Sequence, residues 1–147
     1  MAMDVVDYEI KGSEMQFVEV ELDPGEAAVG EAGSMMFMEA GIAMDTIFGD
    51  GSQQSSGLWG ALVGAGKRLI TGEKMFTTVY VNQAAQKRRV AFAAPFPGKI
   101  MPLDLRKLGG TVIAQKESFL CAARGVMRAP HGFIRCGRAR GSGIPHA

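Results

Sequence analysis

Apolar and polar residues alternate along the segment QFVEVEL, residues 16–22. Its valines and its leucine point to one side of an extended chain, and Glu19 and Glu21 point to the other. A period of two is typical of an antiparallel strand with one buried face. The segment DPGE, residues 23–26, then predicts a turn, because proline presets φ and glycine accepts a positive φ.

Short apolar runs separated by turn residues continue along the chain. The segment SMMFMEAGIAMDTIF predicts a hairpin around Gly41, with residues 35–39 paired to residues 42–46 and the methionines filling the core. The other strand-like segments are AAVGEAG (27–33), KMFTTVYVN (74–82), RRVAFAA (88–94), KIMPLDL (99–105), GTVIAQ (110–115) and SFLCAA (118–123). Pro102 predicts an edge position or a bulge for its strand. Strands at this spacing predict an all-β fold, a β-sandwich or barrel.

The glycine-rich stretch GALVGAGKRLITGE, residues 60–73, does not fit a phosphate-binding loop. Such a loop needs a hydroxyl residue after its lysine to hold magnesium, and Arg68 follows Lys67. A dinucleotide-binding motif would need glycine where Leu69 stands. The spacing of the leucines instead predicts one short helix near residues 58–70.

Two interpretations of this helix remain open. It is either a contact helix that meets a partner subunit or a membrane surface through Leu58 and Trp59, or a plug over the open end of the sandwich. Lys67 and Arg68 fall in its last turns, where cations favour the negative end of the helix dipole. These four residues are the candidate contact residues.

Residues that carry catalysis are sparse. Residues 1–126 contain no histidine, so they cannot build the histidine metal site of a cupin-type enzyme or a Ser-His-Asp triad. Cys121 lies in an apolar strand, which indicates a buried, inert thiol. The cluster Lys87-Arg88-Arg89 either contacts phosphate, forms a solvated hairpin edge or guards against edge pairing. The sequence therefore predicts no enzyme, no cofactor and no metal site.

Composition divides the chain into two parts. Among 147 residues, 47% are apolar and the net charge is +1, but residues 127–147 hold four arginines and no acidic residue. Residues 1–126 are therefore acidic, which argues against a nucleic-acid interface. We expect a sandwich domain over residues 1–126 and a basic tail over residues 127–147 that is disordered or non-native. No signal-like segment or membrane-spanning run is visible, which favours a cytoplasmic location with reduced thiols.

Several ordered segments resemble a known family. They are EAGSMMFME, GLWGALVGAGKRLITGEKMFTTVYVN, RVAFAAPFPGKIMPLDL and SFLCAARGV. Together, over roughly residues 4–126, they resemble the family named after altered inheritance of mitochondria protein 24. The resemblance implies a sandwich like that of the tryptophan RNA-binding attenuation protein, related to the double-stranded β-helix. It implies no catalytic residues and, because fold alone does not give function, no RNA or tryptophan binding. Family members run on past SFLCAARGV with further strands, so the change of composition at Met127 suggests a truncated member.

The leading hypothesis is therefore a non-enzymatic, self-associating β-domain that acts as a scaffold, with a peripheral membrane contact. One alternative is a nucleic-acid-binding module that uses Lys67, Arg68 and residues 87–89. The other is a cupin-like protein that binds a metal or a small molecule.

Overall fold

The computed structural model describes residues 4–48, 76–115, 118–129 and 133–136. Within these ranges the chain is all-β, with no helix. The predicted fold class is confirmed. The helix expected near residues 58–70 lies outside the described residues.

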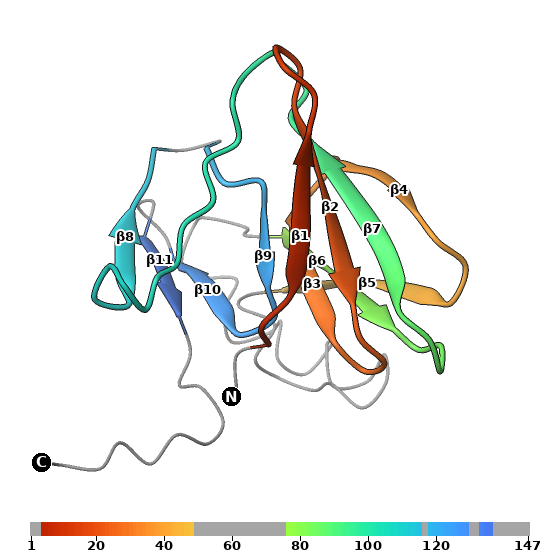
Figure 1. The fold of residues 1–147 in the computed structure, drawn as a ribbon. Helices are drawn as coiled ribbons and strands as arrows, with labels where there is room; N and C mark the ends of the chain where they lie inside the picture. The colour runs from red at the N-terminus through yellow and green to blue at the C-terminus, as the bar shows by residue number, and fades with distance from the viewer. Residues whose placement is uncertain (1–3, 49–75, 116–117, 130–132, 137–147) are drawn as a thin grey trace, which may run out of the picture.

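Strands build three antiparallel sheets (Figure 1). The front sheet has the order β1-β2-β7-β4, the back sheet β5-β6-β3-β9, and the small sheet β10-β11-β8. The small sheet lies beside the sandwich made by the other two (Figure 1). The strand bounds are β1 Asp7–Lys11, β2 Phe17–Leu22, β3 Ala27–Glu31, β4 Met35–Met38, β5 Ile42–Phe48, β6 Phe76–Asn82, β7 Arg88–Ala93, β8 Thr111–Ile113, β9 Cys121–Ala123, β10 Val126–Ala129 and β11 Phe133–Cys136.

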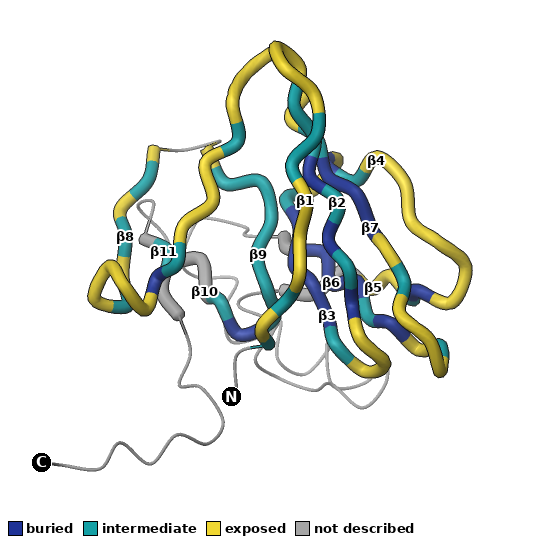
Figure 2. Tube along the Cα trace, viewed as in Figure 1, coloured by how far each residue is buried: buried dark blue, intermediate teal, exposed yellow. Residues whose placement is uncertain are grey.

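The main core lies between the front and back sheets. Alternation along β2 sends Val18, Val20 and Leu22 inward, where they join residues of β7, β6, β5 and β3 in one buried cluster. Dark blue segments mark the buried stretches of β2, β3, β6 and β7 (Figure 2). Face-to-face packing of two sheets over one apolar layer defines a β-sandwich.

At the centre of the core, an aromatic ring lies directly over a glycine. Phe92 on β7 is fully buried and meets Tyr80 on β6 edge-to-face, with ring centroids 5.2 Å apart. A Cβ atom at Gly30 on β3 would lie 2.6 Å from Cε1 of Phe92. The missing side chain therefore lets the two sheets close around this ring.

Asn82 fastens one end of the sandwich. Its buried side-chain nitrogen donates to the carbonyls of Leu22 and Gln86, at 2.8 Å each, and its Oδ1 accepts from the amide of Ala84 at 3.0 Å. One side chain thus joins the end of β2 to the loop between β6 and β7. All its hydrogen-bonding groups are satisfied, as burial requires.

The hairpin predicted around Gly41 is wrong. Its two arms are strands, but β4 pairs with β7 in the front sheet and β5 pairs with β6 in the back sheet. Gly41, with φ of 96°, turns the chain from one sheet to the other. Both arms can then bury one side in the same core, through Met35 and Ile42.

The structure differs from the predicted strands at two further places. Residues 99–105 form no strand, so Pro102 lies in a long connection from β7 to β8. The N-terminal strand β1, paired to β2, was not among the predicted strands. β10 and β11 lie across and beyond the boundary proposed at residue 126, which itself stays a prediction.

Candidate functional site

The four candidate contact residues from the sequence, Leu58, Trp59, Lys67 and Arg68, lie outside the described residues. The described part of the chain has other candidate surfaces. Three stand out: a charged face on the front sheet, an apolar side where β4 and β5 run, and an apolar tip at one end.

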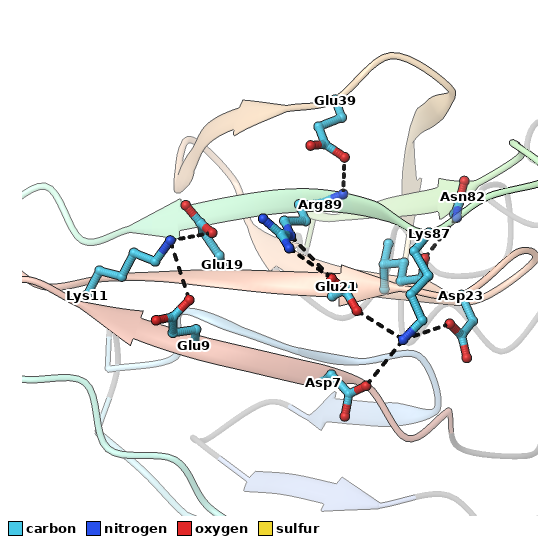
Figure 3. A network of polar contacts seen from close by, with 11 residues as sticks. Asp7, Glu9, Lys11, Glu19, Glu21, Asp23, Glu39, Asn82, Lys87 and Arg89 are labelled. Atoms are coloured by element: carbon cyan, nitrogen blue, oxygen red, sulfur yellow. Dashed lines mark hydrogen bonds and ion pairs between the residues drawn. The ribbon is translucent and has the colours of Figure 1, made fainter.

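The charged face is the solvent side of the front sheet (Figure 3). Nζ of Lys87 lies 2.9 Å from Glu21, 3.3 Å from Asp23 and 3.7 Å from Asp7, so one ammonium group joins three carboxylates. These contacts, led by the hydrogen bond to Glu21, raise the pKa of Lys87 well above its ordinary range. Lys87 therefore stays protonated, and its positive charge is balanced by the protein's own carboxylates.

Neighbouring residues repeat this pairing. Arg89 donates to the same Glu21 at 3.2 Å, and Lys11 lies 2.7 Å from Glu19 and 3.4 Å from Glu9. The hydrogen bonds from Lys87 and then from Arg89 lower the pKa of Glu21, and the hydrogen bond to Glu19 raises the pKa of Lys11. Glu19 and Glu21, which the alternating pattern placed opposite the buried face of their strand, are therefore partners in an ion-pair network.

The cluster at residues 87–89 does not guard a sheet edge. β7, which begins at Arg88, lies between β2 and β4 inside the front sheet, so the edge-guard interpretation is wrong. Nε of Arg88 is buried without a hydrogen-bond partner. The phosphate-contact interpretation has little support from Lys87 and Arg89, because both already bind carboxylates.

We expect the Glu21→Gln variant to be less stable than the wild type at pH 7, with a difference that shrinks in acid. The pKa of Glu21 in the folded protein lies below its ordinary value of 4.5. Its stabilising contribution is therefore present above pH 4.5 and is lost as the pH falls through the lowered folded pKa. Urea midpoints at pH 7 and near pH 3 measure this closing difference. Glu14→Gln, at an exposed position, is the control, and a difference that stays constant with pH contradicts the prediction.

A shallow depression of about 150 Å³ lies on this charged face. Ligand pockets typically measure roughly 300–1,000 Å³ and are mostly apolar. This depression is smaller and mostly charged, and its acids already pair with lysine or arginine. It is lined by Asp7, Tyr8, Glu9, Glu19, Glu21 and Arg89.

Cys121 fits the inert thiol predicted from the sequence. It lies on β9, half-buried against the main core, and it is a free cysteine. Burial raises its pKa to about 12. Since the thiolate is the reactive form, this side chain is a poor nucleophile at neutral pH.

The apolar side consists of Met36, Phe37 and Met38 on β4 together with Met44 on β5. Met36 is 56% exposed and Met44 54%. β4 and β5 are edge strands of the front and back sheets, and β5 contacts β7, which places both edges on one side of the sandwich (Figure 1). The expectation that the methionines fill the core is therefore correct for Met35 alone among these positions.

The apolar tip lies at the end where the β1–β2 hairpin projects (Figure 1). The connection after β7 lies against this hairpin: the amide of Gly98 donates to the Glu14 carbonyl at 2.9 Å, and that of Ile100 to the Gln16 side chain at 2.7 Å. The tip is defined by three exposed apolar side chains, Met15, Phe96 and Met101, of which Phe96 is 74% exposed.

No cluster of three or more His, Cys, Asp or Glu side chains in the described ranges could hold a metal ion. In the same ranges, no helix is long and apolar enough to cross a membrane.

The fold and these surfaces define an all-β sandwich protein with an ion-pair network on its front sheet and exposed apolar side chains on its apolar side and apolar tip. The profile of the family described as "Mitochondrial biogenesis AIM24" matches residues 8–143. The chain therefore belongs to this family, as the sequence resemblance predicted. The match runs through most of the segment that composition had set apart as a tail.

The chain is similar to two proteins of Streptococcus pyogenes. An uncharacterised protein of Streptococcus pyogenes serotype M6 is 37% identical over 94 residues, which make up 62% of this chain and 36% of that protein. A crystal structure of a Streptococcus pyogenes protein superposes with a TM-score of 0.51 at 18% identity, over 88% of this chain and 58% of that chain. The structural match supports the fold alone. This chain thus spans about a third of the one relative and over half of the other.

Proposed function

We propose that this protein is a non-enzymatic scaffold that self-associates through its apolar side. The observation that carries the proposal is the run of exposed apolar residues along β4, with Met44 also exposed on β5 at the same side of the sandwich. Large contiguous apolar patches are rare on the surface of monomeric soluble proteins and commonly mark interaction sites.

The paired state of the ionisable groups supports a non-enzymatic role. General acid–base catalysis needs a group whose pKa lies near the working pH. The charged face instead holds its acids and bases in ion pairs, and burial raises the pKa of Cys121 to about 12. A cytoplasmic location is part of the proposal, because a free thiol is typical of a reducing compartment.

Sedimentation velocity over a wide range of protein concentration tests self-association. We expect a reversible monomer–oligomer equilibrium in which the mean sedimentation coefficient rises with concentration. A single monomeric species up to millimolar concentration would refute the scaffold proposal.

A peripheral membrane contact has a specific observation of its own in the apolar tip. Lys99 lies beside the tip and donates to the carbonyl of Ser13. Exposed apolar side chains next to a cation suit the boundary between lipid headgroups and acyl chains. The apolar tip is thus a candidate membrane contact that lies within the described residues.

We expect the double variant Met15→Ser/Phe96→Ser to float less with anionic liposomes than the wild type, because it removes two exposed apolar groups from the tip. Val5→Ser, also at an exposed apolar position, is the matched control. Trp59→Ala forms a separate arm that tests the contact predicted from the sequence. If the wild type itself does not float with anionic vesicles, the membrane contact is rejected and the scaffold proposal is unaffected.

A further inference from the structure

The front sheet has two edge strands of opposite chemical character. β1 carries Asp7, Glu9 and Lys11, and charged side chains are a common protection against edge-to-edge pairing. β4 carries no charge and no proline from Ser34 through Met38. Among the described strands β4 pairs with β7 alone. β1 is therefore a charge-protected edge, whereas β4 carries no charged side chain that would oppose pairing with another strand.

We propose that β4 pairs antiparallel with β4 of a second copy, across a two-fold axis at Phe37. This inference rests on the proposed self-association and specifies its geometry. Phe37 then faces Phe37 of the second copy, and Met36 faces Met38 on either side. Facing aromatic side chains on paired strands stabilise a sheet. The two front sheets become one continuous sheet through the dimer.

The positions of the charged residues favour a second copy as the partner of β4 and favour antiparallel pairing. The first charged residue after the apolar run is Glu39, whose carboxylate accepts from the amide of Arg89 at 2.8 Å and whose own amide donates to the Arg89 carbonyl. Antiparallel pairing centred on Phe37 places the two Glu39 side chains at opposite ends of the contact. A parallel copy would bring the two Glu39 side chains side by side. A charged peptide in place of the second copy would lose the hydration of its charges against methionine and phenylalanine.

The short length of β4 limits the strength of the proposed contact. β4 has four residues, and its register against β7 shifts between Met35 and Phe37, so the regular part of the free edge is short. Stable interfaces bury roughly 1,200–2,000 Å² in total. A contact built on one short strand falls near or below this range. We therefore expect a weak, concentration-dependent dimer.

The first test is sedimentation velocity on Phe37→Lys and Phe37→Thr, with Met101→Lys as the matched control. Met101 is also exposed and apolar, but it lies on the apolar tip. Two lysines facing each other repel, so Phe37→Lys should raise the dimer dissociation constant by more than about tenfold. Phe37→Thr keeps a good strand former and should weaken the dimer without affecting the fold. Circular dichroism verifies that each variant is folded.

The second test is disulfide trapping. Facing residues on antiparallel strands have Cα atoms roughly 4.5–5.5 Å apart, within the range that a disulfide spans. In a Cys136→Ser background, Phe37→Cys should form a covalent dimer on mild oxidation, while Met101→Cys should not. Loss of association in the Phe37 variants together with trapping at position 37 supports the proposal. Wild-type association that persists unchanged in Phe37→Lys overturns the β4 geometry while self-association itself stands.

Discussion

Replacing Phe92 with alanine is expected to lower the free energy of unfolding by about 3–5 kcal/mol, the range for a phenylalanine removed from a close-packed core. Phe92 is fully buried, meets Tyr80 edge-to-face and covers Gly30. Its loss leaves a cavity between the two sheets, where the backbone cannot collapse without breaking strand pairing. Urea unfolding followed by circular dichroism measures the effect, and a loss below about 1 kcal/mol would contradict the close packing described.

Gly30→Ala provides a coupled measurement. On its own, the added methyl group meets the Phe92 ring at 2.6 Å and should destabilise the protein by about 1–3 kcal/mol through overpacking. Combined with Phe92→Ala, the same methyl group enters the space that the ring has left. The double variant should therefore lose less stability than the sum of the single variants. Additive effects would show that the ring and the glycine do not pack as described.

Asn82→Ala is expected to cost about 2–4 kcal/mol, because it removes three hydrogen bonds from a buried position. The carbonyls of Leu22 and Gln86 lose their donor, and the amide of Ala84 loses its acceptor. Thermal or urea unfolding measures the change. The matched control is Gln83→Ala, at the next position, where the side chain is exposed.

Asn82→Asp sharpens this second prediction. A carboxylate keeps the acceptor for Ala84 but places negative charge against two carbonyl oxygens. The variant should be strongly destabilised at pH 7, and it should regain stability relative to wild type as the pH falls and the carboxyl group is protonated. Equal stability of Asn82→Ala and wild type would mean that the side chain does not fasten the end of β2 to the loop between β6 and β7.

Local sequence pattern predicted most strands but not their partners. The alternation along residues 16–22 correctly predicted β2. The proline and glycine of DPGE correctly predicted the turn in which Gly25 has a φ of 84°. The segment around Gly41 looked like a hairpin because two apolar runs flank a glycine. Pairing between distant strands decides the outcome, and one sequence window carries no information about it.

The functional surfaces were harder to predict for a different reason. Met36, Phe37 and Met38 are apolar, and apolar residues are buried in most proteins, so the sequence suggested core filler. Their lack of alternation was a usable signal, since a half-buried strand should place a polar residue at every second position. The ion pairs of Lys87 depend on residues 64 to 80 positions earlier in the chain and left no local pattern.

The crossing at Gly41 has a consequence for synthesis on the ribosome. β4 leaves the ribosome well before β7, its partner in the front sheet, which ends at Ala93. At roughly 5–20 residues per second, the 55 residues between Met38 and Ala93 take about 3–11 s to translate. During this interval Met36, Phe37 and Met38 emerge on a nascent chain that has no strand to receive them. We expect chaperones that bind short apolar segments to bind this one during that interval.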